Sequence, residues 1–205
     1  MRERLIILGA SGHGKVVADI ALSLNQWKTI AFLDDNESLT TSMGYPVIGK
    51  TNDFSSFLMD SDFIIAIGNN KTRQDVFIKL ELANASIVTL VHPKSVIGSY
   101  VEIGIGTVIM AGVVINACTK IGKGCIINTS SSVDHDNTLS DFVHISPGAH
   151  LAGNVSIGTR TWIGMGSNII QNVSIFEDVI IGAESVVLKS IEKAGTYVGN
   201  PVRRI

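Results

Sequence analysis

The sequence has little of what marks the secreted, membrane-spanning or nucleic-acid-binding classes. Its 205 residues include only two cysteines, which have no metal-motif spacing, and this usage is typical of a reducing compartment. Sixteen basic and eighteen acidic residues give a net charge of −2, which offers no electrostatic footprint for nucleic acid or an anionic membrane. No apolar run approaches membrane-spanning length, and the run at 5–8 is too short for a signal peptide. We therefore expect a cytoplasmic protein with no nucleic-acid partner and no membrane insertion.

What the sequence does contain is a strict repeat of six residues. Every sixth residue is aliphatic over about ninety residues, and a second column of mostly small residues stands two positions before it. Neither a helix nor a hairpin meander has this period, but a coil with three short flat faces does, because each face points one aliphatic residue into a narrow core. The sequence predicts a left-handed parallel β-helix of hexapeptide repeats, with about five coils. The aliphatic positions are Ile97, Ile103, Ile109, Ile115, Ile121, Ile127, Val133, Leu139, Ile145, Leu151, Ile157, Ile163, Ile169, Ile175, Ile181 and Val187.

The first ninety residues follow a different pattern, in which apolar strands alternate with helical stretches. This alternation predicts a small, parallel, Rossmann-like α/β sheet. His92-Pro93 marks the expected boundary, so that a nucleotide-sugar-binding domain covers 1–92 and the β-helix covers 93–205. The expected strands are 5–8, 30–33, 63–67 and 87–91, and the expected helices follow Gly14 and cover 72–83.

Polar residues follow three of these strands, and we expect them to lie at the same edge of the sheet, here called the rim. The turn at 9–14 has the pattern G-x-x-G-x-G, which is not the dinucleotide fingerprint, yet its amides precede a helix and could cradle a phosphate. Asp34 and Asp35 follow the second strand, where such folds read a ribose or base, and Asn69 follows the third. The pattern favours nucleotide binding over its alternative, a glycine turn beside a solvated acidic loop.

Within the repeat, the most polar stretch is 128–136. His135 falls two residues after the inward Val133, near a coil corner, and Asp136 adjoins it. Gly153 lies one coil further on, which stacks its backbone about 4.8 Å from His135. A histidine with a carboxylate partner is a candidate general base, and a glycine amide beside it can polarise a carbonyl oxygen. The alternative is an exposed loop histidine beside a surface acid.

Two other kinds of site are less favoured by the spacing. Zinc held between coils needs stacked histidines, but His135, His144 and His150 are nine and six residues apart, and no close pair is separated by eighteen. Neither Cys118 nor Cys125 is expected at an outward position, which argues against a covalent thiol route.

Several motifs occur together in one known family, in the same order. They are Gly-Ala-Ser-Gly-His-Gly at 9–14, Phe-Leu-Asp-Asp at 32–35, Ala-Ile-Gly-Asn-Asn at 66–70, Asn-Thr-Ser-Ser at 128–131, His-Asp at 135–136, Pro-Gly-Ala at 147–149, Ala-Gly-Asn at 152–154 and Gly-Asn-Pro at 199–201. Over essentially its whole length the chain resembles the bacterial sugar O/N-acyltransferases, a group that contains the sialic acid O-acetyltransferases. It most resembles the acetyl-CoA-dependent N-acetyltransferases of UDP-4-amino-4,6-dideoxy-N-acetylglucosamine, the bacillosamine precursor.

This resemblance implies a homotrimer with active sites between neighbouring subunits and no metal. His135 would be the general base, taking a proton from the sugar amine as the amine attacks the acetyl thioester directly. Asp136 would orient and charge-balance His135, in a position where the relatives carry the longer glutamate.

The resemblance also implies where the two substrates bind. For acetyl-CoA, Asn128 and His144 would shape the acetyl pocket and the Gly153 amide would hold the thioester carbonyl. The CoA arm would pass Met165 and Ala183 and end near the turn that contains Pro201. For the UDP-sugar, the base would lie near Asp34 and Asp35. The residues expected at the phosphates are Ser11, Gly12, His13 and Gly14.

Three other functions remain open at this stage. O-acetylation of a sugar hydroxyl, as in sialic acid modification, needs the same base and thioester pocket, and the Asp34-Asp35 pair only favours a nucleotide-linked acceptor. A zinc hydratase of the carbonic anhydrase type would need the missing histidine ladder. A non-catalytic trimeric scaffold would not need the polar residues around His135.

Overall fold

The computed structural model describes residues 3–205 and divides the chain into two compact units, one ending at Leu90 and one beginning at Val91. The sequence analysis placed this boundary two residues later. The elements of the first unit are β1 (Arg4–Leu8), α1 (Gly12–Leu24), β2 (Thr29–Leu33), β3 (Thr41–Ser42), β4 (Tyr45–Pro46), the 3-10 helix η1 (Thr51–Phe57), β5 (Ser61–Ile65), α2 (Asn70–Leu82) and β6 (Ser86–Ile87).

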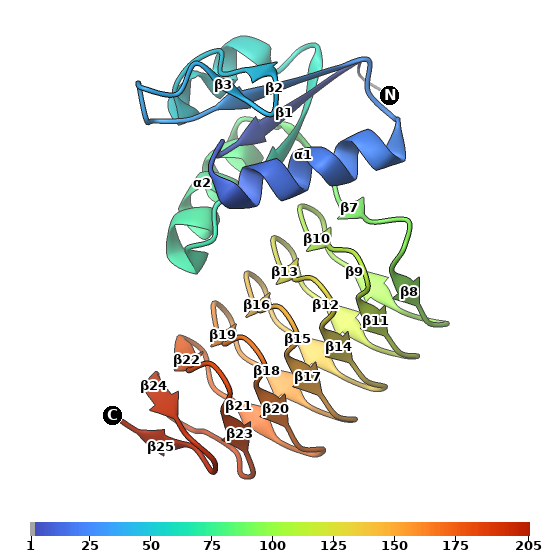
Figure 1. Cartoon of the computed structure of the whole chain (residues 1–205), viewed down its shortest axis with the longest axis vertical. Helices are drawn as coiled ribbons and strands as arrows, with labels where there is room; N and C mark the ends of the chain where they lie inside the picture. The colour runs from blue at the N-terminus through green and yellow to red at the C-terminus, as the bar shows by residue number, and fades with distance from the viewer. Residues whose placement is uncertain (1–2) are drawn as a thin grey trace. The chain divides into compact units, whose positions relative to one another are not determined.

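The first unit is built on a four-stranded parallel sheet with strand order β2-β1-β5-β6 (Figure 1). Its strands are the continuous apolar runs seen in the sequence, and β1 from Leu5 to Leu8 is fully buried, as expected for a parallel sheet covered on both faces. Helix α1 packs on β1 and α2 packs on β5. The strand expected at 87–91 is instead two short strands, β6 and β7 (Leu90–Val91), and β7 belongs to a different sheet.

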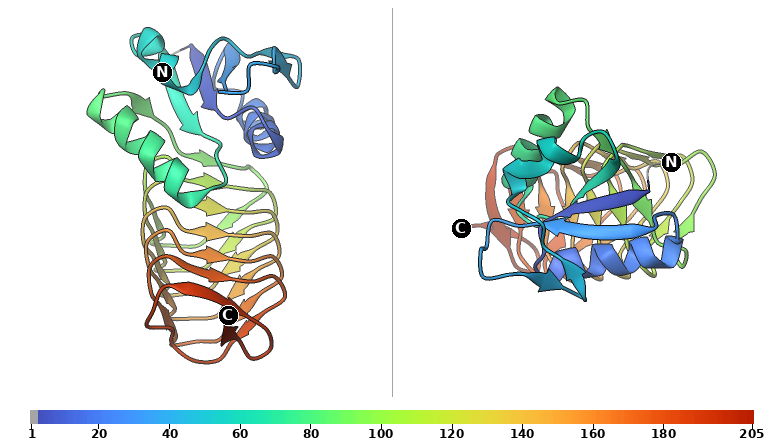
Figure 2. Two further views of the ribbon diagram at one scale, coloured as in Figure 1. Left: turned by 90° about the vertical axis from the view of Figure 1, so that its left-hand side faces the viewer. Right: turned by 90° about the horizontal axis from the view of Figure 1, so that it is seen from above.

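The second unit is a left-handed parallel β-helix, here called the rod, in which three flat faces follow one another around each coil (Figures 1 and 2). This confirms the fold predicted from the repeat. The first face contains β7, β10 (Val108–Ile109), β13 (Ile126–Ile127), β16 (His144–Ile145), β19 (Trp162–Ile163), β22 (Val179–Ile181), β24 (Gly195–Val198) and β25 (Arg203–Arg204). The second face contains β8 (Val96–Ile97), β11 (Val114–Ile115), β14 (Ser132–Val133), β17 (His150–Leu151), β20 (Asn168–Ile169) and β23 (Val186–Val187). The third contains β9 (Glu102–Ile103), β12 (Lys120–Ile121), β15 (Thr138–Leu139), β18 (Ser156–Ile157) and β21 (Ser174–Ile175).

Strands of one face pair in register with a spacing of eighteen residues, for example His144 with Trp162. From Ile109 to Val187 the aliphatic column is almost entirely inaccessible, and the small column behind it is buried too. Polar members of the small column are satisfied across coils. The Asn137 amide, for instance, donates to the Ala152 carbonyl at 3.0 Å and accepts the Val155 N–H at 3.0 Å. These bonds lock each coil to its neighbours.

The coil corners use the left-handed backbone region, which asparagine, aspartate and glycine tolerate best. The corner between the second and third faces has a positive φ at Tyr100, Cys118, Asp136, Asn154 and Asn172, each eighteen residues apart. Cys118 is exposed at this corner, so the expectation that neither cysteine points outward is wrong for Cys118 and holds for the buried Cys125. The physical reason is that Cys118 is a corner residue, outside both inward columns.

No helix in the part of the chain that the structure describes is long and apolar enough to span a membrane.

Candidate active site

One group of predicted site residues gathers at the corner between the second and third faces. We call it the His135 corner, formed by 116–118, 134–136 and 152–154 of three successive coils. Asp136 occupies the left-handed position of its turn, with φ of 58°, and its Oδ2 lies 2.7 Å from His135 Nδ1. The shorter carboxylate therefore reaches the imidazole without the extra methylene of glutamate.

This contact defines which nitrogen of His135 can act as a base. A carboxylate only accepts hydrogen bonds, so Nδ1 carries the proton and Nε2 keeps its lone pair. The bond to Asp136, together with the charges of Asp134 and Asp136, raises the pKa of His135. The His135 side chain is 59% exposed, so solvent or a substrate can reach it.

Gly153 packs directly against the imidazole of His135. A β-carbon on Gly153 would lie 2.6 Å from both Cε1 and Nε2 of His135, so any side chain there would displace the ring. Within residues 3–205, the Gly153 N–H has no hydrogen-bond acceptor, although the neighbouring Asn154 N–H donates to the His135 carbonyl at 3.0 Å. An uncommitted amide beside a base is an arrangement that can polarise a carbonyl under attack.

His144 is not part of this corner. It lies on the first face, on β16, whereas His135 lies in the turn between β14 and β15. The two histidines are nine residues apart, which is half of an eighteen-residue coil, so they lie on different sides of the rod. The predicted catalytic pair, His135 and Asp136, thus lies together, whereas the single chain places His144, expected at the acetyl group, on another side of the rod.

The surroundings of His144 fix its tautomer. Asn128 Oδ1 accepts the Thr129 N–H at 2.8 Å, which turns its amide nitrogen toward His144 Nε2 at 3.2 Å. Nε2 is then the acceptor, and His144 is neutral with its proton on Nδ1. Trp162 stacks on the ring with centroids 5.6 Å apart and planes 3° apart, and its indole N–H donates to Ser146 Oγ at 2.7 Å. The sequence analysis did not identify Trp162, although it lies eighteen residues after His144.

The residues expected along CoA line one side of the rod, which we call the Met165 edge: the turns between the first and second faces at 128–131, 146–149, 164–167 and 182–185. Met165 is exposed, and its carbonyl accepts the Glu184 N–H at 2.8 Å, so that Ala183 follows one coil later. The turn that contains Pro201 comes next, since the Val186 N–H donates to the Gly199 carbonyl at 3.0 Å. Asn128 lies at the other end of the same edge.

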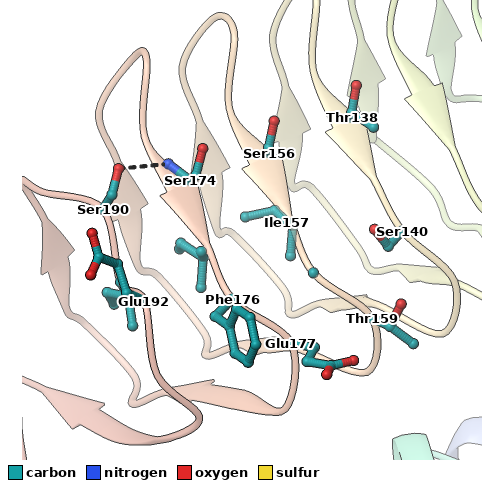
Figure 3. A pocket seen from close by; sticks show the side chains of 13 residues that line it. Thr138, Ser140, Ser156, Ile157, Thr159, Ser174, Phe176, Glu177, Ser190 and Glu192 are labelled. Carbon is teal, nitrogen blue, oxygen red and sulfur yellow. Dashed lines mark hydrogen bonds between the residues drawn. The ribbon is translucent and has the colours of Figure 1, made fainter.

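A groove of about 720 Å³ on the third face has a different chemical character (Figure 3). A column of hydroxyl side chains follows its length, and the Ser174 N–H donates to Ser190 Oγ at 3.0 Å. Glu177 and Glu192 are the carboxylates of its lining, which contains neither histidine nor cysteine. The column consists of Thr138, Ser156, Ser174 and Ser190. The groove therefore does not supply the basic nitrogen found at the His135 corner.

In the first unit, the three polar loops meet at the carboxyl edge of the sheet, as expected. The Gly9 N–H donates to the Leu33 carbonyl at 2.8 Å, and Asp34 Oδ2 accepts the Ala10 N–H. Asp34 Oδ1 also accepts the Asn36 N–H at 2.8 Å, and Asp35 accepts the Thr51 N–H at 2.8 Å. Both acids thus stabilise their loops, a structural role that was not expected from the sequence.

The glycine-rich turn is closely packed where it meets α1. A β-carbon on Gly14 would lie 2.1 Å from the Gly9 carbonyl oxygen, so only glycine fits there. Ser11 and Gly12 are exposed at the start of α1, and Ser11 makes no side-chain cap to the helix. Their position offers backbone amides to an anion at a helix N-terminus.

The half-buried His13 lies near enough to the buried Arg73 to be affected by its charge. Burial, and then the charge of Arg73, lowers the pKa of His13 to about 4, and among the described residues its Nε2 has no hydrogen-bond partner. Arg73 donates to the carbonyls of Ile67 and Gly68 at 3.0 and 3.1 Å. Asn69 caps α2 by accepting the Thr72 N–H at 2.9 Å. The sequence analysis did not identify Arg73, because an arginine within a helix normally indicates a solvated face.

No group of three or more His, Cys, Asp and Glu side chains within residues 3–205 is arranged to hold a metal ion.

Known proteins resemble this chain in both sequence and structure. The family model of the PglD N-terminal domain matches residues 4–80. GDP-perosamine N-acetyltransferase of Escherichia coli O157:H7 is 32% identical over 185 residues, covering 86% of this chain and 82% of the relative. UDP-N-acetylbacillosamine N-acetyltransferase of Bacillus subtilis (strain 168) is 36% identical over 112 residues, covering 53% and 52%. The acetyltransferase domain of PglB from Neisseria gonorrhoeae FA1090, solved in complex with acetyl coenzyme A, superposes with a TM-score of 0.97 at 37% identity, covering 100% of both chains.

Proposed function

The chain belongs to the sugar N-acyltransferase family, and we propose that it transfers an acetyl group from acetyl-CoA to the 4-amino group of a UDP-linked amino-dideoxy sugar. The observation that carries the proposal is the His135–Asp136 pair beside the uncommitted Gly153 amide. This pair provides a base, its orienting carboxylate and a carbonyl-binding donor within one corner of the rod.

In the proposed reaction the neutral sugar amine attacks the thioester carbonyl, while Nε2 of His135 takes a proton from the attacking nitrogen. A C–N bond forms, the C–S bond breaks, and the proton passes from the imidazolium to the leaving CoA thiolate. Asp136 keeps Nδ1 protonated and balances the transient positive charge. The Gly153 N–H stabilises the negative charge that develops on the carbonyl oxygen. The attack is direct and needs no covalent enzyme intermediate.

We propose that acetyl-CoA lies along the Met165 edge. Asn128 and His144 would border the acetyl group, and Met165, Ala183 and Pro201 would border the rest of the arm. Two features support this placement. Asn128, Met165, Ala183 and Pro201 follow one another along a single edge, with His144 next to Asn128, and the matched PglB domain was solved with acetyl coenzyme A.

A homotrimer with active sites between subunits is part of the proposal. In one chain the His135 corner and the Met165 edge are separated by the whole second face. A symmetric assembly of parallel rods can bring the edge of one copy to the corner of the next, and it also covers exposed apolar side chains such as Trp162 and Ile180. Analytical ultracentrifugation tests this assembly, and a monomer at working concentration would contradict it.

The nucleotide is proposed to bind the rim of the first unit. Its phosphates would contact the amides of 11–14, and its base would lie near Asp34 and Asp35, with Asn69 on the adjoining loop. One observation favours a second candidate within this class, a GDP-linked amino sugar, because the relative that covers 86% of the chain is a GDP-perosamine N-acetyltransferase.

The test is thiol release from acetyl-CoA with a panel of acceptors: UDP-4-amino sugars of different configuration, GDP-perosamine, UDP-N-acetylglucosamine and free sialic acid. Turnover confined to a UDP-4-amino sugar supports the proposal. Preferred turnover of GDP-perosamine identifies the second candidate, and turnover of sialic acid moves the enzyme to O-acetylation. No turnover with any acceptor would contradict both nucleotide-sugar candidates.

A further inference from the structure

The backbone of His135 is held by a side chain that the proposed reaction does not use. Asp134 Oδ1 accepts the His135 N–H at 2.9 Å and, at the same time, the Asn116 amide at 2.7 Å. Asn116 is eighteen residues before Asp134 and therefore occupies the same corner position in the preceding coil. On the other side, the His135 carbonyl accepts the Asn154 N–H at 3.0 Å. The peptide units that carry the imidazole are thus fixed from the coils on both sides.

This arrangement distinguishes one corner from its equivalents in the rod. The matching positions in successive coils are Gly98, Asn116, Asp134, Ala152 and Ile170, so the paired polar side chains occur only in the coil of His135 and the coil before it. At the next corner the residue after Ala152 is Gly153, whose N–H has no acceptor within the described chain. Asn154 and Asn172 also pair across coils at this corner, at 2.8 Å, but two positions later in the turn. At the position that precedes His135, the coils with Gly98, Ala152 and Ile170 form without a polar pair, so the pair is not needed to form a coil.

We propose that Asn116 and Asp134 are positioning residues for His135: Asn116 fixes the Asp134 carboxylate, and Asp134 fixes the His135 backbone and adds a second negative charge beside the imidazole. This inference rests on the proposed role of His135 as the base. A fixed backbone holds the ring against Gly153, and a nearby anion stabilises the imidazolium that forms when the amine gives up its proton.

The ionisable groups around His135 are few. On its own turn they are Asp134 and Asp136, and the adjacent turn at 116–118 adds only Cys118, while 152–154 adds none. Hydrogen bonds from Asn116 and from the His135 N–H lower the pKa of Asp134, so it is charged at neutral pH. Asp136 contacts the ring directly and Asp134 does not, so the two carboxylates have separable roles.

Asp134→Asn is the main test, because it removes the charge and leaves a side-chain oxygen for the His135 N–H. The imidazolium then loses one neighbouring anion, so the pKa of His135 falls and the acid limb of the kcat/KM profile moves to lower pH. The weaker base and looser ring should reduce the plateau roughly three- to tenfold, less than the loss of a general base. The His135 titration is followed by NMR, with assignment from His135→Asn.

Asp141→Asn is the matched control. Asp141 is a corner carboxylate of the same rod that accepts a backbone N–H from the preceding coil, that of Lys123, at 2.9 Å. It lies between the third and first faces, away from His135, so we expect no change in the His135 titration. If Asp134→Asn and Asp141→Asn gave the same titration and the same acid limb as the parent, the proposal would be overturned.

Asn116→Ala tests the fixing of the Asp134 side chain separately from the Asp134 charge. It leaves the Asp134 carboxylate charged but frees it from its neighbour, so the plateau should fall roughly two- to fivefold with little movement of the acid limb. An unchanged plateau would overturn the role given to Asn116. The NMR titration needs no turnover, so it still tests the arrangement if His135→Ala retained activity and the proposed base were wrong.

Discussion

Two histidines, one in each unit, show how burial and neighbouring charge give the same side chain opposite properties. His13 is half-buried in the glycine-rich turn, and partial burial together with the charge of Arg73 lowers its pKa to about 4. His135 is exposed at a coil corner between two carboxylates, and its pKa is raised. His13 therefore stays neutral at physiological pH, whereas His135 can take up and release a proton. This difference is consistent with the proposal that His135, rather than His13, acts as the base.

The largest effect should come from removing the basic histidine. His135→Ala is expected to lower kcat/KM for acetyl transfer roughly 10²–10⁴-fold, the usual scale for a lost general base, with little change in CoA affinity. Thiol release measures the rate and calorimetry the affinity. His150→Ala is the control, since His150 is an exposed histidine on the second face whose Nδ1 lies 2.8 Å from Ser132 Oγ. Equal rates for the two variants would show that His135 is not the general base.

The lowered pKa of His13 should instead make the free energy of unfolding depend on pH. Its folded pKa of about 4 is below the unfolded value of about 6.5, so the unfolded state binds the proton more readily. The stabilisation is complete above pH 6.5 and is lost as the pH falls toward 4, by at most roughly 3 kcal/mol.

Urea unfolding of the first unit measures this loss. Trp27 reports on that unit once Trp162, the other tryptophan, is replaced by phenylalanine. His13→Gln in the same background removes the titrating group and should flatten this part of the pH dependence. A loss of the same size in both variants would show that His13 does not titrate as the structure indicates.

Gly153→Ala tests the contact that orients His135. The added β-carbon would lie 2.6 Å from the imidazole, and the ring, being the end of a flexible side chain, can move away. We expect kcat/KM to fall roughly tenfold, while the unfolding free energy changes by less than about 1 kcal/mol. Activity assays and urea unfolding measure the two quantities. Unchanged activity would mean that the ring position seen here is not the reactive one.

Asp34→Ala should have the smallest effect, and this effect should be limited to binding of the nucleotide-sugar acceptor. Loss of a carboxylate near the base is expected to raise the acceptor KM roughly three- to tenfold and to leave kcat and the KM for acetyl-CoA nearly unchanged. Because Asp34 also accepts the Ala10 and Asn36 N–H groups, thermal unfolding accompanies the kinetics. An unchanged acceptor KM in a stable variant would move the nucleotide site elsewhere.

Much of the fold could be predicted from individual residues. The six-residue column from Ile97 to Val187 indicated the rod, because only one side-chain position per face can point into a triangular core. The structure extends this rod beyond the column at both ends. Before it, β7 keeps the spacing, since Val91 lies six residues before Ile97, whereas after it β24 pairs with β22 out of the repeat, Ile181 opposite Tyr197. In the first unit, α2 begins at Asn70 rather than 72, because Asn69 is the capping residue.

The site was less predictable, for geometric reasons. His135 and Gly153 could be predicted to lie next to each other, because a spacing of eighteen residues places two residues at the same corner of adjacent coils. The same rule would have paired His144 with Trp162 and Asn116 with Asp134, but these residues carry no motif that would have led us to apply it. Arg73 could not be foreseen, since its burial depends on the loop carbonyls it contacts.

The sequence by itself therefore determined the two architectures, the residues that share each coil corner and the net charge of −2, because these follow from local periodicity and composition. Tertiary structure alone decided that Asp136 reaches the Nδ1 of His135, that His13 is kept neutral by burial and that Cys118 faces outward. The physical reason is that hydrogen bonding, desolvation and the direction of a side chain depend on which coils and loops surround it, and residues far apart in the chain supply those surroundings.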